Sequence, residues 1–169
     1  VQRHVRQVRD DLAREWLPQR FAALGVHIIG SDANFTDRNT LLAGDVEVRA
    51  KRFGVGTGSV PKIPDIAVLD TFAYLTEETL PELTRRPTSV LVVGSGQTAI
   101  GYAQALQRLG SNVPLIAQDS ILPEQDPEHT EILLRQLRSD GIAIMQETAL
   151  SAVERRGKTG VRVHLHRGG

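Results

Sequence analysis

The chain contains no cysteine. A disulfide, a thiolate metal site, a cysteine nucleophile and a redox-active cysteine pair are therefore excluded within its 169 residues. The 20 lysines and arginines balance the 20 aspartates and glutamates, so no excess charge favours nucleic acid or a membrane surface as a partner. No apolar run approaches the roughly 18 residues of a membrane-spanning helix. Because the first residues are also too charged for a signal peptide, we expect a cytoplasmic protein that binds neither nucleic acid nor a membrane.

Several residue patterns that carry chemistry in other proteins have ordinary explanations in this chain. The five histidines share no metal-ligand spacing with carboxylates, so we predict no metal site. The acidic residues at 124–131 precede or begin an expected helix, where carboxylates commonly cap the first turn. No serine lies in a Gly-x-Ser-x-Gly context, which argues against a hydrolase.

The first third of the chain predicts a small mixed unit. Apolar residues recur three or four positions apart over residues 5–16, which predicts an amphipathic helix with one buried face. These apolar residues are Val5, Val8, Leu12 and Trp16. A further turn or two of helix is expected over 19–24, and the β-branched run at 26–29 predicts a strand. The turn-rich segment 30–48 predicts an antiparallel hairpin or meander, and residues 52–64 combine a short strand with glycines and prolines that suit a domain junction.

The rest of the chain predicts a β-α-β unit, after a connecting segment with a short helix around 76–80. The expected order is a strand at 89–93, a glycine-rich turn at 94–99, a helix through 109, a strand at 113–117, a helix at 127–139 and a strand at 142–145. The inner side of the second helix is expected to carry Ile132, Leu133, Leu134 and Leu137. Two antiparallel strands are expected at 149–154 and 161–166. This order predicts an α/β fold.

The glycine-rich turn is the candidate for chemistry. It consists of Gly94, Ser95, Gly96, Gln97, Thr98 and Ala99. A turn of this kind between a buried strand and a helix exposes backbone N–H groups that bind phosphate. Gly94 permits the tight turn, Gly96 lets a pyrophosphate approach the backbone, and Ala99 is small enough for close helix-strand packing. The sequence therefore predicts a dinucleotide site at this turn.

Three stretches, in order, resemble the FAD-dependent pyridine nucleotide-disulfide oxidoreductases, the family that includes mercuric reductase, glutathione reductase and dihydrolipoamide dehydrogenase. They are RFGVGTGSVPKIPDI at 52–66, the linker and glycine turn at 69–99, and RLGSNVPLIAQDSILPEQDPEHTEILLRQLRSDGIAI at 108–144. The resemblance implies a Rossmann-like FAD/NAD(P)-binding fold with three layers, a parallel sheet and a small antiparallel meander. It also implies that residues 1–58 are the later part of an FAD-binding domain and that 59–169 are an NAD(P)-binding domain incomplete at its C-terminal end.

The resemblance assigns further roles to individual residues. Thr57 and Gly58 would contact FAD in the full-length parent, while Ala117, Gln118 and Asp119 would border the adenosine ribose of a nicotinamide dinucleotide. Ala117 stands where NAD-preferring members carry an acid, and Gln118 stands where NADP-preferring members often carry arginine. The residues therefore do not decide whether the cofactor is NAD or NADP.

These roles lead to two hypotheses of different classes. In the first, the chain is part of an FAD-dependent oxidoreductase and positions NAD(P)H for hydride transfer to flavin. The full-length parent enzyme would be a homodimer, formed through a domain that this chain does not contain. In the alternative, it is a non-catalytic nucleotide-binding or structural module left from such an enzyme. The sequence does not identify the acceptor substrate.

Overall fold

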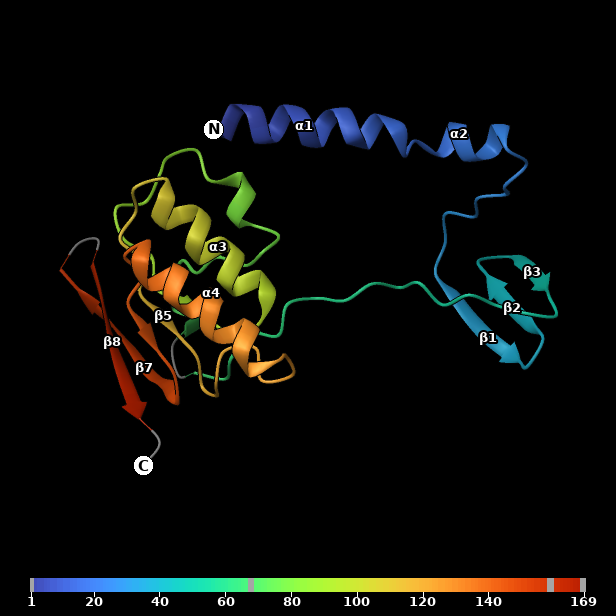
Figure 1. The fold of residues 1–169 in the computed structure, drawn as a ribbon. Coiled ribbons are helices and arrows are strands. Elements are labelled where there is room, and N and C mark those ends of the chain that lie inside the picture. Colours follow the sequence, from blue (N-terminus) through green and yellow to red (C-terminus); the bar gives the residue numbers. More distant parts are fainter. Residues whose placement is uncertain (1, 67–68, 158–159, 168–169) are drawn as a thin grey trace. The chain divides into compact units, whose positions relative to one another are not determined.

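A computed structural model describes residues 2–66, 69–157 and 160–167 (Figure 1). The chain divides into two compact units, Val1–Val60 and Pro61–Gly169. The predicted assignment of 1–58 to a flavin domain and of 59–169 to a nicotinamide-nucleotide domain stays a prediction.

Two helices begin the first unit, α1 (Gln2–Glu15) and α2 (Pro18–Ala23). Both expected helices are confirmed, and Pro18 starts α2 because a proline at the first helical position needs no N–H partner. The prediction of a buried face on α1 is wrong within this unit, since Leu12 is 53% exposed and Trp16 is 70% exposed. Trp16 instead lies beside the ring of Phe21, with 6.1 Å between the ring centroids.

The strand predicted at residues 26–29 is absent from the structure. The N–H of Val26 donates to the carbonyl of Phe21, so the start of this segment completes the end of α2. No described strand pairs with the remaining residues, and Ile28 is 53% exposed. A β-branched run without a partner strand cannot form a ladder, which explains the failure of the prediction. The short strand expected within 52–64 is missing for the same reason.

The antiparallel meander is confirmed. It consists of β1 (Ala33–Asp37), β2 (Thr40–Ala43) and β3 (Val46–Arg49), in the order β1-β2-β3. The tight turn after β2 uses Gly44, whose φ of +59° lies in the left-handed region that favours glycine. The rings of Phe35 and Phe53 meet edge to face, with 5.0 Å between their centroids.

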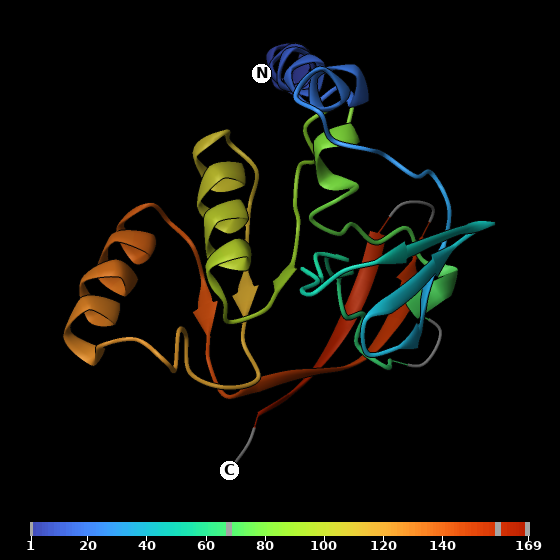
Figure 2. The ribbon, with the colours of Figure 1, turned by 90° about the vertical axis from the view of Figure 1, so that its right-hand side faces the viewer.

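The second unit begins with two short 3₁₀ helices, η1 (Leu69–Thr71) and η2 (Leu80–Glu82), the latter at the end of the predicted short helix. The β-α-β prediction is confirmed by β4 (Val92–Val93), α3 (Gln97–Arg108), β5 (Leu115–Ile116), α4 (Pro127–Ser139) and β6 (Ile144–Met145). The strands are parallel in the order β4-β5-β6, although each is shorter than expected. Figures 1 and 2 show α3 and α4 running side by side over these strands.

The core of this unit joins both helices to the central strand. The most deeply buried large side chains are Leu115, Ile116, Ile121, Leu137 and Val113. Among the four residues predicted to face inward from α4, Leu134 and Leu137 are buried and Leu133 packs partly against the core. Ile132 is 57% exposed, and its prediction is wrong because two residues of helix rotate it by about 200° from Leu134.

A long antiparallel hairpin follows, with β7 (Thr148–Arg156) paired to β8 (Gly160–Arg167). Both predicted strands are confirmed. The turn begins at Gly157, whose φ is +63°. The basic turn residue Lys158 lies outside the described residues.

Candidate functional site

The glycine-rich turn links the end of β4 to the start of α3. The N–H of Gly94 donates to the carbonyl of Ile116 at 2.9 Å, which continues the parallel ladder by one residue beyond β4. Gly94 has a φ of +146°, and a Cβ built there would lie 3.0 Å from the Cβ of Ala99. Residues that carry a Cβ rarely adopt this backbone conformation. The turn thus brings the strand end and the first helical turn close together at two small residues.

Gly96 is the N-cap of α3 and lies in a different environment. Its φ is −86°, no side chain caps the helix start, and a Cβ built on Gly96 would meet no atom within 4 Å. The first N–H groups of an α-helix have no intrahelical acceptor, and the helix dipole makes this end favourable for an anion. Gln97 and Thr98 are exposed beside this open space. The residues therefore fit a phosphate group, which is what a bound dinucleotide would present.

The end of the second parallel strand carries the residues expected near a ribose. Ala117 is wholly buried, and its N–H donates to the carbonyl of Met145 while its own carbonyl accepts from the N–H of Thr148, both at 2.9 Å. Gln118 and Asp119 follow it and are exposed. Of these three residues, only Gln118 and Asp119 expose their side chains.

The carboxyl ends of the three parallel strands meet at one edge of the sheet, so the glycine turn, the β5 end and the β6 end are neighbours. The carbonyl of Ser95 accepts the N–H of Leu122 at 3.0 Å, which joins the glycine turn directly to the loop after β5. Leu122 adopts a φ of +50°, unusual for a residue with a side chain.

Sequence reasoning missed Gln146 and Glu147, which follow β6. The side-chain oxygen of Gln146 accepts the N–H of Ile121 at 2.8 Å, across 25 positions of sequence. Glu147 has a φ of +52° and is exposed. The available signal was their position directly after a parallel strand, where polar residues often serve a site.

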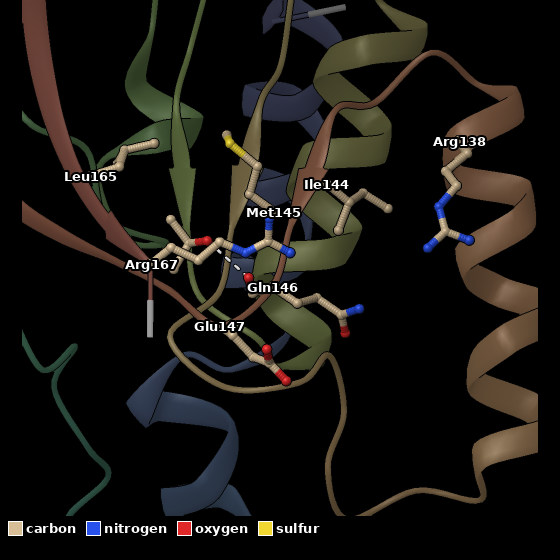
Figure 3. Close-up of a pocket in the computed structure, with 8 residues that line it drawn as sticks. Arg138, Ile144, Met145, Gln146, Glu147, Leu165 and Arg167 are labelled. Atoms are coloured by element: carbon tan, nitrogen blue, oxygen red, sulfur yellow. Dashed lines mark hydrogen bonds between the residues drawn. The ribbon is translucent and has the colours of Figure 1, made fainter. Parts of the chain in front are cut away.

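A pocket of about 500 Å³ lies beside the end of β6. Figure 3 shows Arg138 and Arg167 on opposite sides of it, with Gln146 between them and Glu147 below. The hydroxyl of Thr148 donates to the carbonyl of Gln146 at 2.8 Å, which fixes the backbone at this edge.

The FAD contacts expected from the sequence lie in the first unit. Thr57 and Gly58 are exposed in an extended segment, and Gly58 has a φ of +73° with no neighbouring atom within 4 Å of a built Cβ. Their role stays a prediction.

Two acidic residues, Asp126 and Asp140, have structural roles at the two ends of α4. Asp126 caps α4, as the capping interpretation predicted, because its carboxylate accepts the N–H of Glu128 at 2.8 Å. At the other end of α4 the side-chain amide of Gln104 lowers the pKa of Asp140, with further hydrogen bonds from Gln136 and Arg108. Across residues 2–66, 69–157 and 160–167, no group of three His, Asp or Glu side chains is arranged to hold a metal ion.

The parallel strands, their covering helices and the glycine turn define a Rossmann-like α/β fold. Residues 9–169 match the family described as pyridine nucleotide-disulphide oxidoreductase, and the chain belongs to this family. Enzymes of the family use FAD and NAD(P)H.

One related sequence and two solved structures are similar to this chain. The chain is 32% identical to the mercuric reductase of Lysinibacillus sphaericus over 155 residues, which cover 89% of this chain and 28% of that protein. The HOCl-induced flavoprotein disulfide reductase RclA from Escherichia coli has a similar fold, with a TM-score of 0.77 over 96% of this chain and 38% of that chain, at 21% identity. LpdA from Mycobacterium tuberculosis gives a TM-score of 0.70 at 27% identity, over 85% of this chain and 34% of that chain. This chain spans under a third of the mercuric reductase's length.

No helix in the described part of the chain is long and apolar enough to span a membrane.

Proposed function

We propose that this chain binds NAD(P)H at the glycine turn and positions it for hydride transfer to flavin in an FAD-dependent oxidoreductase. The observation that carries the proposal is the open space at Gly96, over the uncapped start of α3. A pyrophosphate there would accept hydrogen bonds from the first helical N–H groups and would interact favourably with the helix dipole. Membership of a family that uses NAD(P)H supports the same assignment.

The residues of the turn have separate roles in this proposal. Gly94 lets the strand turn sharply into the helix, and Ala99 leaves room for that approach. Gly96, Gln97 and Thr98 would face the phosphates, while Ser95 links the turn to the loop after β5. Gln118 and Asp119 would border the adenosine ribose. NAD(P)H supplies the hydride when bound, and these residues bind and orient it.

The finer architecture belongs to the same proposal. We infer that the helices, the parallel sheet and the β7–β8 hairpin form three layers, and that residues 59–169 are an NAD(P)-binding domain. Residues 1–58 would belong to an FAD-binding domain in which Thr57 and Gly58 contact the flavin nucleotide. The full-length enzyme of which this chain would be a part would be a cytoplasmic homodimer.

The substitution Gly96→Val tests the binding site. Its branched side chain would occupy the open space over α3, so we expect NADH binding by the purified chain to disappear. Binding is measured by calorimetry or by ligand-observed NMR. Gly54→Val is the matched control, because a Cβ at Gly54 also meets no atom within 4 Å but lies in the other unit.

Wild type and the control variant should bind NADH equally. Unchanged binding by Gly96→Val would place the nucleotide elsewhere, and absence of binding by wild type would contradict the proposal for this chain.

A further inference from the structure

The loop after β5 is held at four points along its length, one of them a hydrogen bond from the N–H of Glu147 to the carbonyl of Asp119 at 3.5 Å. At its start, Ala117 exchanges hydrogen bonds with Met145 and Thr148. At its end, the N–H of Leu122 donates to the carbonyl of Ser95. Between these points the N–H of Ile121 donates to the side-chain oxygen of Gln146 at 2.8 Å. This last bond alone among them depends on a side chain and can therefore be removed by substitution.

The environment of Gln146 makes this bond a specific one. Ile121 is only 1% exposed, so its N–H has no access to water and needs a protein acceptor. The side chain of Gln146 is itself half-buried. The backbone carbonyl of the same residue accepts a hydrogen bond from the hydroxyl of Thr148. Backbone and side chain of Gln146 are thus both fixed, which gives the loop a defined position relative to β6.

We propose that Gln146 is a positioning residue that holds residues 118–122 in the conformation that receives the adenosine half of a dinucleotide. This inference rests on the proposed function. Because Ser95 and Leu122 connect the loop to the glycine turn, the bond from Gln146 also supports the relative placement of the ribose and phosphate contacts. Loss of the bond would leave the buried N–H of Ile121 unsatisfied, and the loop would move to reach water or another acceptor.

A matched pair of variants separates positioning from stability. Gln107 makes an equivalent bond near the start of β5, at the opposite end from the loop that Gln146 contacts. The side-chain oxygen of Gln107 accepts the N–H of Val113 at 3.0 Å. Both glutamines are half-buried, and methionine keeps their length without a strong acceptor. We expect Gln146→Met and Gln107→Met to lower the unfolding temperature by similar amounts.

Only the first variant should weaken binding of NADH and of ADP-ribose, by about fivefold for each ligand, the effect of one lost hydrogen bond. ADP-ribose contains the adenosine half without nicotinamide, so an equal loss locates the effect at that half. Hydrogen exchange at Ile121 should accelerate in Gln146→Met. It should stay slow in Gln146→Glu, whose carboxylate retains an acceptor.

The outcomes are distinguishable. If wild type binds NADH and Gln146→Met binds it equally well, the inference about Gln146 is wrong while the proposed function stands. Equal losses of affinity in both methionine variants would show a general stability effect and would also overturn it. If wild type binds neither ligand, the proposed function itself fails, and the inference fails with it.

Discussion

Gly94→Ala should destabilise the second unit without any change in the apolar core. Alanine at this position would keep a φ near +146° and would place its Cβ 3.0 Å from the Cβ of Ala99. A non-glycine residue in a sparsely populated backbone region costs about 1–3 kcal/mol. The close contact adds to this cost because Ala99 lies on the first turn of α3 and moves only with the helix. We therefore expect the free energy of unfolding to fall by about 2 kcal/mol.

Native-state hydrogen exchange measures this change within the second unit alone. The N–H groups of Leu115 and Ala117 donate to the carbonyls of Ala143 and Met145 at β6, so their exchange reports on the centre of the parallel sheet. A loss of about 2 kcal/mol should accelerate their exchange by about 30-fold. The control is Gly96→Ser, because Gly96 has a φ of −86°, open surroundings and a position where serine is a preferred cap.

The control should exchange at the wild-type rate or slightly more slowly. Wild-type exchange rates in Gly94→Ala would refute the reasoning, since they would mean that this turn tolerates a side chain.

Two further predictions concern charge. Hydrogen bonds to the Asp140 carboxylate, above all the one from the Gln104 side chain, lower the pKa of Asp140 below its ordinary value of 3.8. The stability that this carboxylate contributes is therefore present above pH 3.8 and is lost as the pH falls through the lower pKa of the folded state. Urea unfolding between pH 2 and 6 should therefore show a steeper acid loss in wild type than in Asp140→Asn, and equal pH profiles would contradict the assignment. Gln118→Arg should shift preference from NADH toward NADPH by roughly 1.5–3 kcal/mol, the range for a hydrogen bond to a charged group. Titration of wild type and variant with both cofactors measures this shift, and an unchanged ratio would show that other residues contact the 2′-phosphate.

The second unit was the more predictable from sequence because its local signals agree with one another. Apolar runs, the glycine turn and helix periodicity all indicate β-α-β, and the structure has the expected succession of strands and helices along the chain. Asp126 and Pro127 mark the start of α4 through the ordinary preferences of a helix N-terminus. Such signals are local, so one sequence is sufficient to find them.

The failed predictions depend on partners that local sequence does not contain. Residues 26–29 have strand-forming side chains, yet a strand exists only where another strand supplies hydrogen bonds. The apolar stripe of α1 predicts a helix correctly, but burial of that stripe requires a packing surface, and Leu12 stays 53% exposed within its unit. Ile132 is a different case, since helical geometry alone places it opposite Leu134.

The site shows the same division between local and distant signals. The glycine turn is visible in sequence because its residues are consecutive, whereas Gln146 acts on a residue 25 positions away and belongs to no motif. Its partner is a backbone N–H, so the identity of Ile121 carries no trace of the contact. A polar side chain after a parallel strand indicates the correct edge of the sheet but not the group that it binds.

The connection between Ser95 and Leu122 explains why the glycine turn and the following loop should act together. Each segment alone offers little to a dinucleotide, because the turn presents backbone N–H groups and the loop presents two exposed side chains. The proposed binding of phosphate and ribose would be tighter where their spacing is set before the ligand arrives, since ordering a loop on binding reduces affinity. The bond from Leu122 to Ser95 sets that spacing from one side, and the bond from Ile121 to Gln146 sets it from the other. The strained φ of +50° at Leu122 is consistent with a loop conformation imposed by these two anchors.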